Sequence, residues 1–206
     1  QRRISSQVFT VTNADGSSLA DMGADQDWDI FRAYTSTNSA DNTSENTGID
    51  GVVRNFNITK DLQTNNIQMF YVLYADAPFT EAVSSFYKAD WPQTPTANIN
   101  FIVPYQSTEV GVTQRHQGVW NDNAVNFSHT STAVWPENFT VYDGLQIFVD
   151  DDINSYRYGI RSSQTFIFKN GIVRGPDNNT ATAYIAGVFN SANGSYTQSP
   201  QVLVNN

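Results

Sequence analysis

Short β-prone segments separated by turn signals recur along the whole chain, and they constrain its fold more than any other feature. The run Ile67–Tyr74 is apolar on both faces, which is typical of a central strand in a sandwich. Residues 78–88 have apolar residues at helical spacing and are the one predicted helix. No repeat of roughly 20–50 residues is apparent, and this absence argues against a solenoid. The other predicted strands are Gln7–Val11, Trp28–Tyr34, Val52–Thr59, Asn98–Val103, Ala124–His129, Phe139–Tyr142, Leu145–Val149, Tyr156–Ile160, Thr165–Phe168, Ala181–Phe189 and Gln201–Val204.

Two dipeptides predict tight hairpins. Asp143-Gly144 and Asn170-Gly171 each lie between two β-prone segments, and such pairs supply the positive φ angles of a type I′ turn. Many short strands with turn signals between them are typical of a sandwich. The sequence therefore predicts an all-β fold: a single-domain, elongated β-sandwich of the Greek-key or Ig-like kind. A length of 206 residues fits one such domain.

Composition and charge exclude several classes of partner. Hydrophobic residues make up 39% and aromatic residues 13% of the chain, which is too much for a disordered protein. Charged residues reach only 15%, and the formal net charge is −9. This balance argues against nucleic acid, whose phosphates need clustered Lys and Arg, and against anionic membrane surfaces. The acidity itself is adequately explained by solubility.

The absence of cysteine and the polar surface favour an extracellular protein. Cysteine is absent, and Asn, Gln, Ser and Thr replace much of the usual surface charge. No run of about 18 apolar residues occurs, so we expect no membrane insertion. The chain starts at Gln1 without an apolar leader, which is the form expected after removal of a signal peptide.

The N-terminal region differs in character from the rest. Residues 1–11 contain the β-prone segment Ile4–Val11, and residues 12–27 form a polar tether with two glycines. Residues 28–206 are expected to form the body of the sandwich. A strand on a tether can pair with its own sheet or with the sheet of a neighbour, and the first arrangement is the commoner one.

Six triplets match the N-x-S/T pattern for N-glycosylation. Three of them lie in turn-rich polar stretches where a glycan can be accommodated, whereas Asn57 lies inside an apparent strand. Covalent N-glycans are expected, and no other cofactor is. The six candidate acceptors are Asn42, Asn57, Asn126, Asn138, Asn178 and Asn193.

Catalytic and metal chemistry find little support in the sequence. The acidic run Asp150, Asp151 and Asp152 is a weak candidate for calcium, and a solvated turn is the simpler interpretation. Two histidines are too few for a His-rich metal centre, and no G-x-S-x-G motif is present. We therefore expect no catalytic residues and no enzymatic activity. The tryptophans Trp91, Trp120 and Trp135 could stack on sugars, but packing is the more common use of such rings.

The chain resembles the subunits of archaeal thread filaments in its sequons, its lack of cysteine and its N-terminal β segment on a polar tether. Those are β-rich, N-glycosylated proteins that polymerise head to tail by donor-strand complementation. The resemblance implies a structural subunit of an extracellular, cell-surface filament, with adjacent copies as partners and other cells or surfaces as further contacts. Two alternatives remain open: a viral capsid or spike jelly roll, and a carbohydrate-binding adhesin or lectin.

The resemblance further implies that Ile4–Val11 is the donor strand. With a period of two, the segment presents alternate residues to opposite faces, and either face could enter a groove. Gln201–Val204 is the competing candidate for the donor. The donor residues expected at the subunit interface are Ile4, Ser6, Val8, Phe9, Thr10 and Val11.

Overall fold

The computed structural model describes residues 34, 36–41, 61–75, 79–80, 91–107, 111–129, 134–149, 157–175, 185–190 and 201–204. Within them strands dominate and helices are short. The helices are α1 (Thr37–Asp41), α2 (Leu62–Asn65) and the 3₁₀ helix η2 (Val112–Gln114). The strands are β1 (Met69–Val72), β2 (Ile99–Ile102), β3 (Asn126–His129), β4 (Thr140–Asp143), β5 (Gln146–Val149), β6 (Arg157–Ser162), β7 (Phe166–Lys169), β8 (Ile172–Arg174), β9 (Ile185–Asn190) and β10 (Gln201–Val204).

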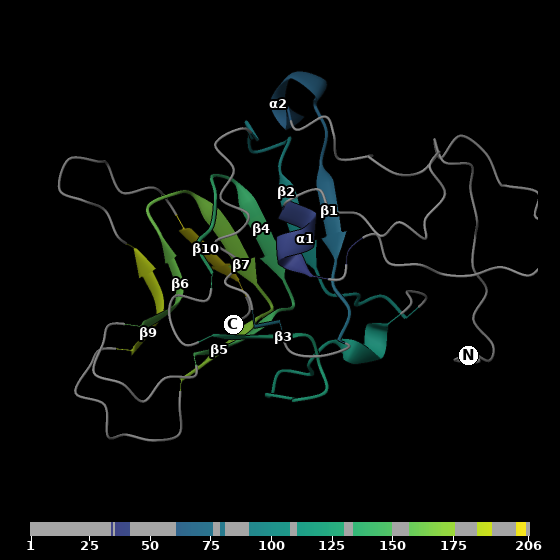
Figure 1. The fold of residues 1–206 in the computed structure, drawn as a ribbon, viewed down its shortest axis with the longest axis vertical. Coiled ribbons are helices and arrows are strands. Elements are labelled where there is room, and N and C mark those ends of the chain that lie inside the picture. The colour runs from purple at the N-terminus through teal and green to yellow at the C-terminus, as the bar shows by residue number, and fades with distance from the viewer. Residues whose placement is uncertain are drawn as a thin grey trace, which may run out of the picture.

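The strands form three sheets, and every pairing among the described strands is parallel. The first sheet has the order β1-β2-β4-β7-β10, the second β3-β5-β8, and the third β6-β9 (Figure 1). Parallel neighbours need a crossover connection between them, so no described pair of strands forms a hairpin. Even β1 and β2, which are consecutive in the chain and adjacent in the sheet, are parallel and joined by a long connection.

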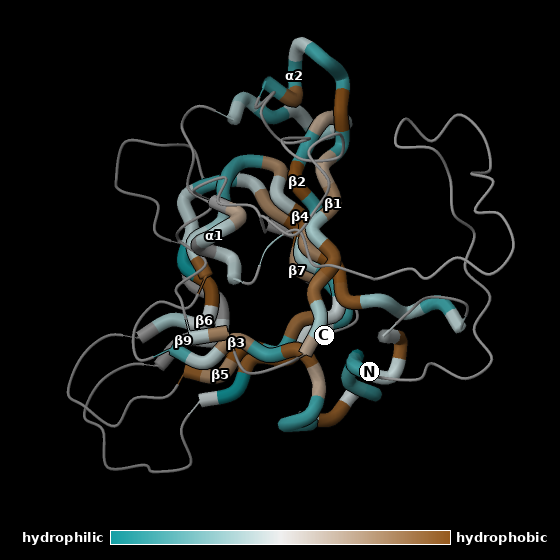
Figure 2. The backbone as a smooth tube through the Cα atoms, turned by 45° about the vertical axis from the view of Figure 1, so that its right-hand side comes forward, coloured by the Kyte–Doolittle hydropathy of each residue, from teal (hydrophilic) through white to brown (hydrophobic). Residues whose placement is uncertain are grey.

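The chain visits the three sheets in turn. From β4 it passes to β5 and β6, and it then returns to the first sheet as β7 before repeating the circuit through β8 and β9 to β10. Figure 2 shows the elements arranged around a common axis, with β1, β2, β4 and β7 on one side, β3 and β5 on another, and β6 and β9 on a third. This is the path of a parallel β-helix, also called a β-solenoid.

The earlier circuits follow the same path, but at two places a single parallel bridge stands where the later circuits have a paired strand. Phe79 forms a parallel bridge with Phe127 of β3, and Val134 forms one with Ile160 of β6. The chain between β2 and β3 is much longer than that between β5 and β4, because it includes η2 and the segment around it. Circuits of unequal length explain why no fixed period is visible in the sequence.

Like residues stack in the core because the strands pair in register. In the first sheet Tyr71, Phe101, Tyr142 and Phe168 occupy one column, all 8% exposed or less. The ring centroids of Tyr71 and Phe101 lie 5.4 Å apart, and those of Phe101 and Tyr142 lie 5.2 Å apart, both pairs nearly parallel. Such columns give each circuit apolar contacts with the next one.

Helix α1 contributes to the same core near β1. Its Thr37 and Ala40 are buried, and the ring of Tyr34, which precedes the helix, lies 6.4 Å from that of Tyr71. None of the described helices is long and apolar enough to cross a membrane.

The β-rich character predicted from the sequence is confirmed, but the arrangement differs. Asp143-Gly144 and Asn170-Gly171 do not close hairpins: β4 and β5 belong to different sheets, and so do β7 and β8. The described strands therefore do not form an antiparallel Greek-key sandwich. The physical reason is that a positive φ serves equally well where a chain bends from one sheet into the next. Gly144 has a φ of 82° and Asn170 a φ of 50° at these corners.

Local strand positions were predicted better than their pairing. The segments Asn98–Val103 and Phe139–Tyr142 overlap β2 and β4, and Gln201–Val204 coincides with β10. The helix expected at 78–88 is not seen at Phe79, which instead bridges to Phe127. The predicted donor strand 1–11 and tether 12–27 lie outside the described residues, as does the start of the body predicted at 28–206.

Candidate functional site

The structure describes two of the six candidate glycan acceptors. Asn126 is 6% exposed in β3, and its side-chain amide donates to the carbonyl oxygen of Ala124 at 2.9 Å. This amide nitrogen would be the point of attachment, so the folded arrangement does not favour a glycan there. Asn138 is half-buried, and its Oδ1 accepts from the backbone N–H of Thr165 at 3.1 Å. Its sequon is therefore the better placed of the two.

The remaining predicted site residues lie outside the described part of the chain. This applies to the other four sequon asparagines, to the weak metal candidates and to the donor strand. Among the residues that are described, no group of three or more His, Asp or Glu side chains could hold a metal ion. The residues outside the description are Asn42, Asn57, Asn178, Asn193, Asp150, Asp151, Asp152, Ile4, Ser6, Val8, Phe9, Thr10 and Val11.

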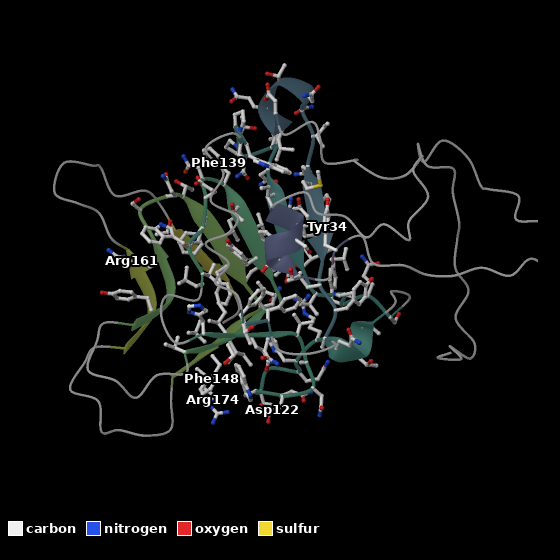
Figure 3. The ribbon with its side chains drawn as sticks, viewed as in Figure 1. Tyr34, Asp122, Phe139, Phe148, Arg161 and Arg174 are labelled. Atoms are coloured by element: carbon white, nitrogen blue, oxygen red, sulfur yellow. The ribbon has the colours of Figure 1, made fainter. Side chains whose placement is uncertain are left out.

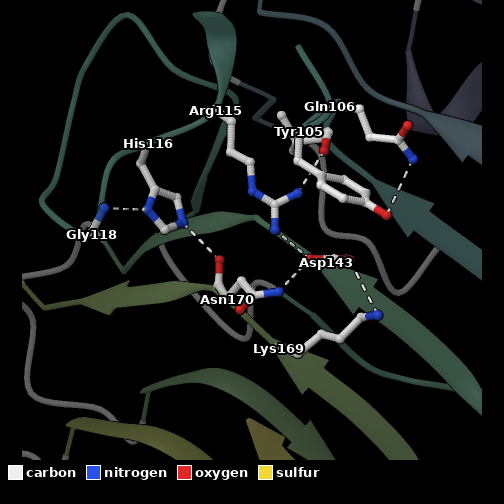
Figure 4. A network of polar contacts seen from close by, with 9 residues as sticks. Tyr105, Gln106, Arg115, His116, Gly118, Asp143, Lys169 and Asn170 are labelled. Carbon is white, nitrogen blue, oxygen red and sulfur yellow. Dashed lines mark hydrogen bonds and ion pairs between the residues drawn. The ribbon is translucent and has the colours of Figure 1, made fainter. Parts of the chain in front are cut away.

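The densest polar cluster lies where the first sheet bends into the second (Figure 4). Asp143, at the end of β4, accepts from the Arg115 guanidinium and from the Asn170 side-chain amide at 2.9 Å. Its second oxygen lies 3.2 Å from the Lys169 ammonium. Arg115 also donates to the carbonyl oxygen of Val103 at 2.7 Å. One carboxylate thus joins two successive corners to the long segment that contains η2.

A histidine completes this cluster. His116 is 9% exposed, and one ring nitrogen, Nε2, lies 2.8 Å from the carbonyl oxygen of Asn170. The other, Nδ1, accepts from the backbone N–H of Gly118 at 3.2 Å. The neutral tautomer with its proton on Nε2 satisfies both contacts.

The environment lowers the pKa of both Asp143 and His116. Burial raises the pKa of Asp143, but hydrogen bonds from Asn170 and Arg115 and the charges of Arg115 and Lys169 outweigh it, so the pKa lies below its ordinary value. Burial lowers the pKa of His116, and the Arg115 charge adds to this effect against the hydrogen bond to Asn170. Both shifts favour an ionised Asp143 beside a neutral His116.

This cluster has the chemistry of a clamp rather than that of a catalyst. Both carboxylate oxygens of Asp143 and both ring nitrogens of His116 already contact other groups of the protein. A general base needs a free lone pair directed at a substrate proton, and a nucleophile needs access. We therefore interpret the corner as a structural clamp, which the sequence signalled only by Asp143-Gly144 and Asn170-Gly171.

Two arginines lie against pairs of aromatic rings elsewhere on the surface (Figure 3). The Arg174 guanidinium carbon lies 5.6 Å from the Trp120 ring centroid and 5.3 Å from that of Phe148. The Arg161 guanidinium carbon lies 5.3 Å from the Trp135 ring centroid and 5.4 Å from that of Tyr158. The sequence offers Trp120 and Trp135 as exposed candidates but carries no sign of their cationic neighbours.

The first sheet presents another surface feature at its two outer strands. On β1 Phe70 is 51% exposed and Val72 is 42% exposed. At the opposite end β10 pairs with β7 on one side, and no described strand pairs with its other side.

Comparison with known proteins gives no relative. No family model matches the chain, and no curated protein or solved structure shows significant similarity to it.

Proposed function

We propose that this protein is a structural subunit of an extracellular filament, which polymerises head to tail by adding the N-terminal strand of one subunit to a sheet of the next. The observation that supports the proposal best is the five-stranded parallel sheet, whose last described strand is β10. The edge of a sheet carries a row of N–H and C=O groups that can template another strand. Adding a strand from a second copy satisfies those groups and contributes side-chain contacts.

The register of the sheet supports a particular alignment of the N-terminal segment with this edge. Position three of each strand is held by Tyr71, Phe101, Tyr142 and Phe168, and Leu203 of β10 stands at the same position. The sequence Gln7-Val8-Phe9-Thr10 has the same pattern as Gln201-Val202-Leu203-Val204. In this register Phe9 lies beside Leu203 and Val8 lies beside Val202.

This register favours one face of the donor strand as the inward one. Phe9, Gln7 and Val11 share the inward face, whereas Val8, Ser6, Thr10 and Ile4 share the outward one. Burying Phe9 beside Leu203 would stabilise the contact by roughly 1.5–3 kcal/mol. Since the contact joins an N-terminal segment to the last strand of another copy, it does not close on itself and propagates as a fibre.

Single-cysteine subunits test the proposal directly, because the natural chain has no cysteine. Phe9→Cys subunits are mixed with Leu203→Cys subunits under mild oxidation. Neighbouring parallel strands lie about 4.8 Å apart, within the range a disulfide spans. We expect covalent dimers and filaments in the mixture. A Thr10→Cys variant, whose residue belongs to the other face, is the matched control and should cross-link poorly.

Deletion of residues 1–11 is the second arm of the experiment. The truncated protein should remain soluble and unpolymerised, and added peptide 4–11 should bind to it. Filaments of normal appearance in electron micrographs of the truncated protein would overturn the proposal. Disulfides formed only within a Phe9→Cys/Leu203→Cys double variant, and never between subunits, would show that the strand folds back on its own chain.

Glycosylation belongs to the same proposal. We propose N-glycans at Asn42, Asn57, Asn178 and Asn193, and at Asn138 in preference to Asn126. Glycopeptide mass spectrometry of protein from its natural source measures each site separately. Unmodified peptides at all six positions would contradict the proposal that the protein is N-glycosylated.

A further inference from the structure

Among the described residues, Arg161 has no carboxylate partner, although the protein is acidic. The chain has 20 Asp and Glu against 11 Lys and Arg, and at the β4 corner one carboxylate serves both Arg115 and Lys169. Arg161 makes no ion pair with a described carboxylate, and its Nε is enclosed without a hydrogen-bond partner. A guanidinium normally finds an anion or water for its five N–H groups. Arg161 therefore has hydrogen-bonding capacity that the described protein does not use.

The aromatic neighbours fix the guanidinium in place. Trp135 and Tyr158 lie at 5.3 and 5.4 Å from its central carbon, which holds the group by cation–π attraction. Nε is buried without a hydrogen-bond partner, and no hydrogen bond to another described residue engages the two terminal nitrogens, which are the atoms we assign to a ligand. Two terminal N–H groups in one plane match the two oxygens of a carboxylate.

Trp135 adds an apolar surface beside this fork. Its side chain is 38% exposed, although it is among the large hydrophobic residues of the protein. The Arg161 guanidinium lies over the Trp135 ring, so the remaining exposed part of the indole is what can contact the apolar ring of a ligand whose carboxylate meets Arg161. A uronic acid has both, since its carboxylate is bonded directly to the sugar ring.

We infer that Trp135, Tyr158 and Arg161 form a binding site for a uronic acid residue of an acidic polysaccharide. Arg161 receives the carboxylate and Trp135 contacts the ring. The site belongs to a single subunit beside the β6–β9 sheet (Figure 3), so it does not depend on filament assembly. Its ligand chemistry would allow the protein to attach to an acidic cell-surface or matrix glycan.

Calorimetric titration of the full chain with a β-1,4-mannuronate tetramer tests the inference. The neutral β-1,4-mannose tetramer is the matched ligand, because it differs only in carrying a hydroxymethyl group in place of each carboxylate. Saturable binding of the mannuronate tetramer is expected, with at least tenfold weaker binding of the neutral one. Equal binding of both, or no binding at millimolar concentration, would overturn the inference.

Matched variants assign the binding to the site. Arg161→Gln should weaken binding roughly tenfold or more, and Arg161→Lys less, because lysine keeps the charge but not the fork. Arg174→Gln removes the same charge from the other arginine–aromatic cluster and should leave the affinity unchanged. Equal losses in the Arg161 and Arg174 variants would show a general charge effect and refute the site. Circular dichroism checks that each variant is folded.

The tryptophan supplies an independent measurement. Trp135 fluorescence should change on addition of the mannuronate tetramer, and Trp135→Phe should remove that change while Trp120→Phe keeps it. Sodium acetate at equal ionic strength should not displace the tetramer, because it has no ring. Displacement by acetate at matched carboxylate concentration would identify a simple anion site instead.

Discussion

His116 shows how a single side chain can make the fold depend on pH. Burial keeps the imidazole neutral in the folded protein, and the Nδ1 contact with the Gly118 N–H requires an unprotonated nitrogen. Its folded pKa is thus below the ordinary value of 6.5. The stabilising contribution is fully present above that value, and it is lost as the pH falls through the folded pKa.

The free energy of unfolding should accordingly fall between about pH 7.5 and about pH 5.5. The fall should be smaller in His116→Gln, whose amide does not titrate but can still donate to the Asn170 carbonyl. Urea unfolding of both proteins at the two pH values measures the difference. An identical fall in both would mean that His116 does not cause it. Asp143, whose pKa is also lowered, contributes in the same direction but only near and below its ordinary value of 3.8.

The corners between strands are the elements on which the β-helix depends. Gly144 and Asn170 occupy equivalent places after β4 and β7, and both adopt positive φ angles. Gly144 has a second constraint, because a Cβ added there would lie 2.4 Å from the Arg115 guanidinium carbon. A side chain at this position would displace the Arg115 guanidinium from its contact with Asp143.

Gly144→Ala should therefore lower the free energy of unfolding by about 2–4 kcal/mol, through backbone strain and disruption of the clamp. Gly118→Ala is a matched control, since Gly118 has a φ of 85° but no atom within 4 Å of an added Cβ. That variant should lose only about 1–2 kcal/mol, the cost of the backbone conformation. Denaturant unfolding of the two variants compares them, and equal losses would exclude a role for the Arg115 contact.

At the scale of the whole molecule, the circuits stack so that every described strand runs across the stacking direction. If subunits add strands to β10 as proposed, the sheets continue from one subunit into the next. A filament built in this way has its strands perpendicular to the fibre axis.

Aligned filaments should then give a diffraction reflection at about 4.7–4.8 Å along the fibre axis. Subunits joined by globular contacts would orient their strands at other angles and scatter this reflection off the axis. X-ray fibre diffraction of native or reconstituted filaments makes the distinction. A reflection perpendicular to the axis would contradict continuous stacking of the sheets. Whether the subunits polymerise through the N-terminal strand is tested separately by the cysteine cross-links.

Much of the local structure follows from the sequence alone. Alternating and continuous apolar patterns locate β2, β4, β5, β7 and β10 to within a residue or two, because side-chain alternation depends only on the strand itself. Asp143-Gly144 and Asn170-Gly171 lie at corners rather than at the predicted hairpins, and one residue of each pair has the positive φ that is costly for most other residues. The acidic charge and the absence of cysteine are likewise properties of composition.

Only the tertiary structure decided how these segments pair. The same dipeptide permits a hairpin or a corner, and the choice depends on partners from distant circuits, such as Phe168 stacking in register with Tyr142. The repeat is not visible in the sequence because the circuits differ in length, most of all where the long segment with Arg115 and His116 is inserted. The clamp at Asp143 and the arginine–aromatic site at Arg161 join residues far apart in the chain, and spacing alone cannot indicate such contacts.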